Sequence, residues 1–299
     1  MKKQIRGSLC LLLATIIWGF AFIAQSVGMD KIGPFTFQSV RCAMAVLFLI
    51  LCSFLMEFKS CGAQETIKRW LNPSLWRVGL ICGSALFIAA SLQQVGLLYT
   101  DAGKAGFLTA MYIVWVPVLG IFLEKKPPVT IVLSVAMAVI GLYLLSCIGV
   151  SQINKGDLLL IGCALAFAVQ ITCIDRLAGD LDGLRLSCIQ ALVVTVFSIP
   201  FVVFTETPSL TNIIASWKPL CFAGILSMGV AYTMQVVGQK SLEPTAASLI
   251  MSLESVFAVL GGWWLLGETM TIWESTGCAL VFAAVILSQL PVGLFRKRT

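Results

Sequence analysis

The sequence contains no histidine at all. This absence removes the commonest protein ligand for transition metals and the side chain that most often moves protons near neutral pH. We therefore predict no metal site and no resident cofactor, and we assign any proton chemistry to carboxylates. The chain also lacks a glycine-rich phosphate-binding loop, which argues against a pump that hydrolyses nucleotides by itself.

Charge is scarce throughout the chain. Only 11% of the 299 residues are charged and 59% are hydrophobic, with a mean hydropathy of +0.98. A soluble domain has about 25% charged and 45–50% apolar residues, so this composition predicts a polytopic membrane protein. The net charge of +6 does not indicate nucleic-acid binding, because the basic residues flank apolar runs and form no single patch.

Clusters of reactive side chains are also rare. A membrane enzyme should gather His, Asp, Glu or Cys at the membrane surface, and the one dense charged group, Asp175, Arg176, Asp180 and Asp182, has the character of a solvated loop. The 11 cysteines are odd in number, and most lie inside apolar runs, which is typical of small buried hydrophobes rather than disulfides. We predict that the protein is not an enzyme.

Long apolar runs are what the chain has in abundance. Ten of them approach the roughly 20 residues that a helix needs to cross a bilayer. They cover approximately residues 7–26, 33–56, 76–98, 103–123, 128–147, 157–177, 185–204, 217–239, 245–266 and 272–292. The first run follows a basic start, as in a secretory signal, but it is longer than a usual signal core, so we expect it to be retained. The fold class predicted is all-α integral membrane, with ten transmembrane helices.

The basic residues predict the orientation. With a cytoplasmic N-terminus, 15 lysines and arginines fall in cytoplasmic segments and 4 in outer segments, while Arg41 lies within a span. The excess of positive charge normally marks the cytoplasmic side. We predict that both termini are cytoplasmic and that the protein crosses the cell membrane several times. In a bacterium this would be the plasma membrane, and membrane lipids would surround the protein.

The two halves of the chain resemble each other. Shifts of 149 residues in the first part of each half and 142 in the second part superimpose like residues. The aligned pairs are Gly7 with Gly156, Trp18 with Phe167, Arg41 with Gln190, Gln93 with Gln235, Gly96 with Gly238 and Ser146 with Ser288. We predict one five-helix repeat in residues 1–150 and a second in 151–299. Because five is odd, the second repeat is inverted, an arrangement that commonly holds a substrate near the midplane and supports alternating access.

One carboxylate lies deep in an apolar run. Glu254 stands ten residues after Pro244, about 15 Å into a hydrocarbon core of about 30 Å. An ionisable side chain there costs on the order of 2.5–3.5 kcal/mol even on the gentler scales, so it should face a cavity or a partner. Its helical stripe also contains Ala247, Met251 and Ala258. We predict that Glu254 belongs to a functional site.

A buried cation lies at a similar predicted depth. Arg41 stands about 12 Å below the outer end of its span. One interpretation is a static ion pair with Glu254 that neutralises two buried charges. The other is functional, with Arg41 receiving a substrate carboxylate and Glu254 binding a proton or a substrate ammonium group. Gln190 and Tyr112 occupy the equivalent positions in the other repeat, so each charge appears once.

Polar and aromatic residues at matching depth are candidates for the walls of a central cavity. They are Trp18, Phe22, Gln25, Gln93, Gln94, Tyr112, Trp115, Phe167, Gln170 and Gln235. The alternatives are core or lipid contact for the aromatics and helix-to-helix hydrogen bonds for the glutamines. Kinks that act as hinges are expected at Pro117 and at Gly261 and Gly262.

The order of several short motifs points to one family. These motifs are Trp18-Gly-Phe-Ala-Phe22, Arg41, Gln93 to Gly96, Ala102 to Leu108, Pro117 followed by Leu123-Glu-Lys-Lys126, Leu253-Glu-Ser-Val-Phe257, and Gly267-Glu268. Across nearly the whole chain, the sequence resembles the drug/metabolite transporter superfamily, in its ten-helix EamA-type branch. That family usually has proline where Ser255 stands.

The resemblance implies a secondary transporter, most often an exporter of amino acids or other small metabolites, with a cavity between the two halves. A buried cation, a buried anion and several aromatics would suit a zwitterion with an apolar side chain. The expected partner is a small-molecule substrate, with no nucleic acid, and a carrier of this kind is driven either by protons or by the substrate gradient alone. The alternative is a passive channel, or a lipid or drug translocator without ion coupling. A channel would favour a continuous polar stripe, and the sequence has only scattered polar residues.

Overall fold

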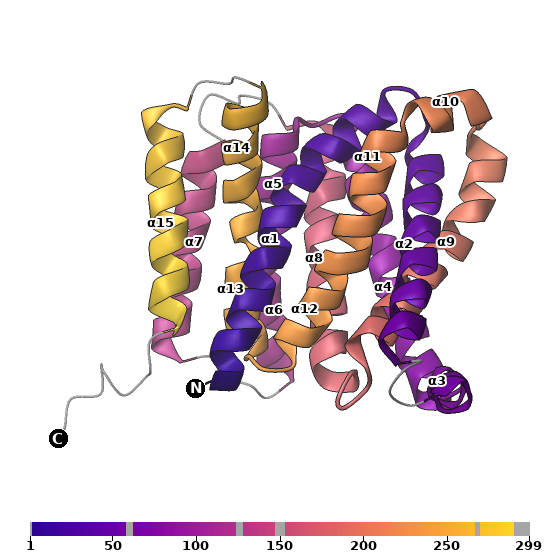
Figure 1. The fold of residues 1–299 in the computed structure, drawn as a ribbon. Helices are drawn as coiled ribbons and strands as arrows, with labels where there is room; N and C mark the ends of the chain where they lie inside the picture. Colours follow the sequence, from indigo (N-terminus) through magenta and orange to yellow (C-terminus); the bar gives the residue numbers. More distant parts are fainter. Residues whose placement is uncertain (1, 58–61, 124–127, 147–152, 267–269, 290–299) are drawn as a thin grey trace.

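The computed structural model describes residues 2–57, 62–123, 128–146, 153–266 and 270–289, and every regular element in these ranges is a helix (Figure 1). In chain order they are α1 (Lys2–Met29), α2 (Pro34–Glu57), α3 (Gly62–Trp70), α4 (Pro73–Gly96), α5 (Ala102–Ala110), α6 (Tyr112–Phe122), α7 (Val129–Ser146), α8 (Lys155–Leu177), α9 (Gly183–Thr205), α10 (Leu210–Ala215), α11 (Trp217–Cys221), the π-helical η1 (Phe222–Ala231), α12 (Tyr232–Gln239), α13 (Pro244–Met251), α14 (Leu253–Leu266) and α15 (Ile272–Gln289).

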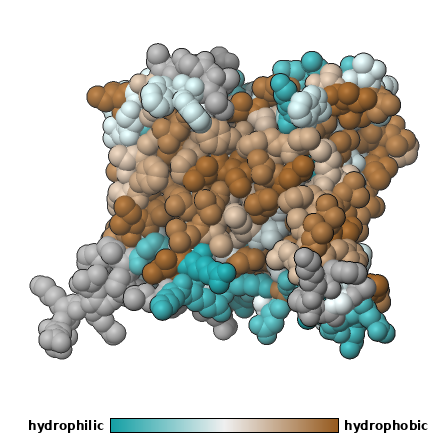
Figure 2. Space-filling view, viewed as in Figure 1, coloured by the Kyte–Doolittle hydropathy of each residue, from teal (hydrophilic) through white to brown (hydrophobic). Residues whose placement is uncertain are grey.

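The structure confirms the all-α membrane fold. Within the described ranges, nine helices or joined helices are long and apolar enough to cross a membrane, and Val129–Leu145 is a tenth, shorter apolar helix. Three spans are composite: α5 with α6, α11 with η1 and α12, and α13 with α14. Figure 2 shows hydrophobic residues across the middle of the visible face and hydrophilic residues along its upper and lower rims. A bilayer requires this distribution of surface chemistry.

The helices pack as two related sets of five spans. α7 lies against α15, and α2 lies against α9, so these helices meet their own counterparts (Figure 1). The remaining contacts exchange between the sets: α8 packs on α4, α5 and α6, while α1 packs on η1, α12, α13 and α14. A twofold relation between the two sets produces this exchange of contacts.

Glycines permit two equivalent close crossings of helices. A Cβ atom on Gly156 of α8 would lie 2.7 Å from the carbonyl oxygen of Gly96 in α4. A Cβ atom on Gly7 of α1 would lie 2.9 Å from the carbonyl oxygen of Gly238 in α12. Small residues allow helix backbones to approach in lipid, where no hydrophobic force drives helices together. The aligned glycines of the two halves therefore serve the same structural purpose.

Both ends of the bundle are tied by polar contacts. Where α1 begins and α15 ends, the Ser8 hydroxyl donates to the Gln289 side-chain oxygen at 3.3 Å, so these two ends share one face. We call this the inner face, following the prediction from basic residues. At the opposite, outer face, the Glu206 carboxylate accepts from the backbone N–H groups of Phe35 and Thr36 in the first turn of α2. A carboxylate there satisfies free N–H groups and offsets the helix dipole.

Two spans are interrupted near their middle, at Met111 between α5 and α6 and at Ser252 between α13 and α14. Their ψ angles are −6° and −15°, flatter than in a regular α-helix. A tighter i→i+3 bond follows each break, from Val114 N to Met111 O and from Ser255 N to Ser252 O. The shift of 142 residues pairs Met111 with Leu253, so the two interruptions lie within one residue of equivalent places in the two sets of helices.

The two breaks do not coincide with the hinges expected from the sequence at Pro117 and at Gly261 and Gly262. α6 continues through Pro117, and α14 continues through Gly261 and Gly262. Pro117 is the sixth residue of α6 and has no N–H group to donate to the carbonyl four residues earlier. That carbonyl belongs to Ile113, which lies in the first turn of α6, next to the break. The lost hydrogen bond therefore concerns one turn next to the break rather than the middle of a long helix.

Candidate functional site

A small cavity with mostly buried walls lies at the centre of the bundle. Its volume is about 30 Å³, room for one or two water molecules. The lining residues are Trp18, Ala21, Phe22, Gln25, Arg41, Gln93, Tyr112, Phe167, Ile171, Ser227, Tyr232, Gln235, Met251 and Glu254. They come from α1, α2, α4, α6, α8, η1, α12, α13 and α14, so both sets of helices contribute to one site.

Glu254 forms one end of the cavity. It is 6% exposed and stands in the first turn of α14, directly after the break at Ser252. The hydroxyl of Tyr112, which begins α6 after the equivalent break, donates to Glu254 Oε1 at 3.0 Å. The two interrupted helices thus bring equivalent residues of the two halves into direct contact. A carboxylate at the start of a helix also interacts favourably with the helix dipole.

Arg41 forms the other end. It is 4% exposed, and its Nη1 donates to Gln25 Oε1 at 2.7 Å. The guanidinium carbon lies 5.8 Å from the centre of the Phe37 ring, within the range of a cation–π contact. Gly224 of η1 permits close packing here, because a Cβ atom at that position would lie 2.8 Å from the Arg41 carbonyl oxygen.

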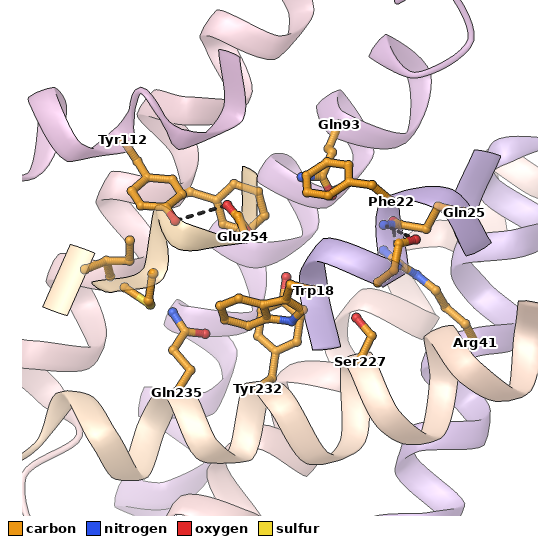
Figure 3. A pocket seen from close by; sticks show the side chains of 14 residues that line it. Trp18, Phe22, Gln25, Arg41, Gln93, Tyr112, Ser227, Tyr232, Gln235 and Glu254 are labelled. Atoms are coloured by element: carbon orange, nitrogen blue, oxygen red, sulfur yellow. Dashed lines mark hydrogen bonds between the residues drawn. The ribbon is translucent and has the colours of Figure 1, made fainter. Parts of the chain in front are cut away.

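The two charges do not neutralise each other. Among the ion pairs between described residues, none involves Arg41 or Glu254. Figure 3 shows the Tyr112–Glu254 pair and the Gln25–Arg41 pair on opposite sides of the site, with Trp18 and Phe22 in the space between. The interpretation as a static ion pair is therefore wrong for this conformation.

The middle of the cavity is aromatic. The rings of Trp18 and Tyr232 meet edge to face with centroids 5.0 Å apart, and those of Tyr112 and Phe167 meet similarly at 6.4 Å. Several polar atoms on the walls have no hydrogen-bond partner within the described part of the chain, namely Trp18 Nε1, Arg41 Nε and Gln235 Oε1. Buried polar atoms without a partner are costly unless water or a ligand satisfies them.

Five of the eight residues predicted for the substrate site line this cavity. They are Trp18, Arg41, Tyr112, Gln235 and Glu254. Phe22, Gln25, Gln93 and Phe167, which the same reasoning placed at matching depth, line it too.

The other three predicted residues lie outside the wall. Gln170 is fully buried one layer behind, where it accepts a hydrogen bond from Gln235 at 3.2 Å and donates to Gln190 at 3.1 Å. Gln94 donates to the sulfur of Met29, and Trp115 packs against the hydrophobic core.

Tyr232 and Ser227 line the cavity but are absent from the sequence-based set. They belong to the span that contains η1, where the wider π-helical turn joins them by a hydrogen bond from the Tyr232 backbone N–H to the Ser227 carbonyl oxygen. π-helical turns often mark functional sites. Tyr232 precedes Gln235 by three residues and so shares its face, which is a signal that the sequence does contain.

Within the described ranges, no group of three or more His, Cys, Asp or Glu side chains is placed to hold a metal ion. The cavity therefore offers one carboxylate, one guanidinium, amides, hydroxyls and aromatic rings. Such a set can bind a small molecule that carries both charges, and its carboxylate can exchange a proton.

Comparisons with known proteins agree with this picture. The EamA-like transporter family matches residues 5–147 and again residues 154–290. An uncharacterized transporter of Archaeoglobus fulgidus is 32% identical over 296 residues, 97% of this chain and 88% of the relative. The threonine/homoserine exporter RhtA of Escherichia coli is 26% identical over 248 residues, 74% of this chain and 82% of the exporter. A solved crystal structure superimposes with a TM-score of 0.81 over 97% of this chain and 98% of the other, at 15% identity.

The family match covers both halves of the chain separately, and the first of these relatives extends over almost its whole length. Together with the apolar helices, these findings describe a multi-pass membrane protein. The chain belongs to the EamA-like transporter family.

Proposed function

We propose that this protein is a secondary transporter that exports amino acids or similar small metabolites across a bacterial plasma membrane by alternating access. The family supports transport, and the printed function of one relative, threonine/homoserine export, supports the substrate class. The observation that carries the proposal is that Arg41 and Glu254 stand at two ends of one buried cavity and share no ion pair among described residues.

The proposed roles follow from the chemistry of each group. Arg41 receives the substrate carboxylate, since a guanidinium fork matches a carboxylate and its Nε has no described partner. Glu254 receives the ammonium group, or a proton when the site is empty, and Tyr112 holds its carboxylate in place. Trp18 and Tyr232 enclose the apolar side chain of the substrate.

Glutamines complete the proposed site in two layers. Gln235 offers an amide oxygen to the substrate, and Gln170 fixes the Gln235 side chain from behind. Gln94 and Trp115 lie away from the cavity, so we assign them to packing rather than to substrate contact.

Transport requires this cavity to open to each side in turn. A volume of about 30 Å³ holds water but no amino acid, so the cavity must widen before it admits such a substrate. We propose residues 1–150 and 151–299 as the two inverted repeats whose relative motion widens the cavity. Protons on Glu254 supply the coupling, with lipids covering the outer surface.

The test is transport by the purified full-length protein in liposomes. Radiolabelled amino acids are offered one at a time, with and without an imposed pH gradient. We expect saturable transport of one class. Loss of a hydrogen bond to a charged group costs about 1.5–3 kcal/mol, so Arg41→Gln should weaken substrate affinity by roughly 10- to 150-fold. Glu254→Gln should remove the response to the pH gradient.

Matched variants separate these effects from a general loss of charge. Glu65→Gln and Arg77→Gln change exposed residues near the inner face and should transport like the unmodified protein. Full pH-dependent transport by Glu254→Gln would refute the proton role. Gradient-independent, non-saturable flux through folded protein would instead indicate the alternative, a passive channel or a lipid or drug translocator.

A further inference from the structure

A compact polar cluster closes the outer ends of α5 and α8. Lys104 Nζ lies 2.6 Å from Asp157 Oδ2, and the two side chains are only 13% and 3% exposed. The Thr100 hydroxyl, just after α4, donates to Asp157 Oδ1 at 3.0 Å. The backbone N–H of Asn154 donates to Asp157 Oδ2 at 2.9 Å. One carboxylate thus joins three helix ends.

The repeat relation locates the equivalent place at the inner face. The shifts of 142 and 149 residues turn Thr100, Lys104, Asn154 and Asp157 into Leu242, Ala246, Ile5 and Ser8, in that order. No charged residue remains among these four. The equivalent of the ion pair is a serine facing an alanine.

All four inner residues line a single open groove. The groove has a volume of about 770 Å³ and lies between α1, α7, α13 and α15. The ion pair that joins α5 and α8 at the outer face therefore has no counterpart among the equivalent residues of α13 and α1, and a groove lies between these helices at the inner face. Because the surrounding helices are equivalent, the difference lies in these side chains rather than in the fold.

The groove approaches the central cavity closely. Ile250 and Leu253 line the groove, while their chain neighbours Met251 and Glu254 line the cavity. One thickness of the interrupted helix α13–α14 separates the two spaces. A shift of α13 at its break next to Ser252 would join them.

We propose that Lys104 and Asp157 form the outer gate of the transport route and that the groove lined by Ile5, Ser8, Leu242 and Ala246 is its inner entrance. This inference rests on the proposed alternating access. The ion pair must separate each time the outer side opens, whereas the four equivalent inner residues offer no ion pair that would hold the inner side closed. The chain is thereby biased towards the conformation that is closed outside, ready to receive cargo from the inner face.

A natural cysteine reports on this gate without any transport assay. Cys163 is fully buried on α8, six residues beyond Asp157, and its sulfur lies 4.0 Å from the Thr109 hydroxyl on α5. It therefore sits in the α5–α8 interface, on the cavity side of the ion pair. Separation of these helices at the outer face would admit a reagent to Cys163.

The experiment measures alkylation of Cys163 in intact cells by a membrane-impermeant maleimide, in full-length protein whose other cysteines are replaced by serine or alanine. We expect slow labelling in this background. Lys104→Gln should raise the labelling rate about tenfold, the effect of a change of roughly 1.4 kcal/mol in the opening equilibrium. The matched control is Lys155→Gln, which removes a neighbouring lysine that lies over the Tyr99 ring and forms no part of the gate; its labelling should stay unchanged.

Installing the lock on the inner side provides the converse test. The double variant Ser8→Asp with Ala246→Lys should close the groove and raise Cys163 labelling, while either single change should not. Equal labelling of the background, Lys104→Gln and the double variant, each shown to be folded by size-exclusion chromatography, would overturn the gate. If labelling responds as expected but no amino acid is transported, the gate stands and the proposed substrate class fails.

Discussion

The two interrupted spans, α5–α6 and α13–α14, differ in what they carry rather than in how they are built. They break at Met111 and at Ser252, within one residue of equivalent positions, and in each the turn after the break supplies a residue to the central cavity. At equivalent positions beyond the break, one supplies the phenol of Tyr112 and the other the carboxylate of Glu254, and these two groups bond to each other. The backbone is repeated, and the chemistry is not.

The same contrast applies to the positive charge. Arg41 faces the cavity, whereas Gln190 at the equivalent position accepts a hydrogen bond from Gln170 behind the wall. The repeated helices therefore form the cavity, and the positions at which the two repeats differ place opposite charges at its two ends. A substrate with unlike ends would be held in one direction only.

Breaking the shared architecture should have the largest effect. Gly156→Leu places side-chain atoms against the backbone oxygen of Gly96, which cannot move aside. Overpacking typically costs about 1–3 kcal/mol and sometimes more, so we expect a marked fall in the apparent Tm in detergent and little folded protein. Gly7→Leu should behave alike, since its crossing is equivalent.

The control for this pair is Gly103→Leu, because a Cβ atom there meets nothing within 4 Å. It should leave the apparent Tm close to that of the unmodified protein. If Gly156→Leu is as stable as Gly103→Leu, the glycine crossings do not hold the two sets of helices together.

Removing the bond between the equivalent residues should have an intermediate effect. Tyr112→Phe keeps the ring but deletes the hydroxyl that donates to Glu254. A hydrogen bond to a charged group is worth about 1.5–3 kcal/mol, so transport efficiency should fall by about tenfold or more. Tyr143→Phe changes a half-exposed tyrosine of α7 and should transport normally. Unimpaired transport by Tyr112→Phe would show that the carboxylate needs no positioning.

Removing a hydrogen bond that exists in only one of the two equivalent helix pairs should have the smallest effect. The Ser255 hydroxyl of α14 donates to the Gly106 carbonyl oxygen of α5 at 2.8 Å, while the residue equivalent to Ser255 is Ile113, which has no hydroxyl. Hydrogen bonds between membrane helices average about 0.6 kcal/mol, so Ser255→Ala should lower the apparent Tm slightly and leave transport near normal. Ser248→Ala, whose hydroxyl bonds within its own helix, is the matched comparison. A larger fall in the apparent Tm for Ser248→Ala than for Ser255→Ala would contradict a stabilising role for the hydrogen bond between α14 and α5.

The helices were predictable because lipid leaves a chain few choices. Each backbone group must be satisfied inside the membrane, so an apolar run of sufficient length becomes a helix. The breaks at Met111 and Ser252 were not predictable, because neither is glycine or proline. The residues that suggested kinks, such as Pro117, lie within continuous helix instead.

The site was predictable where depth alone decides. A charge near the midplane must avoid lipid, which is why Glu254 and Arg41 pointed to the cavity. Rotation about a helix axis is harder to infer when apolar residues surround it on every side. Gln93 and Gln94 are adjacent, yet Gln93 lines the cavity and Gln94 faces Met29.

The small volume of the central cavity sets a condition for binding. Trp18 of α1 and Tyr232 of α12 pack edge to face on its wall, and the space beside them is about 30 Å³. That space admits water but no amino acid. A molecule long enough to reach both Arg41 and Glu254 therefore needs these two rings to part, so that binding of such a molecule and movement of α1 against α12 would be a single event.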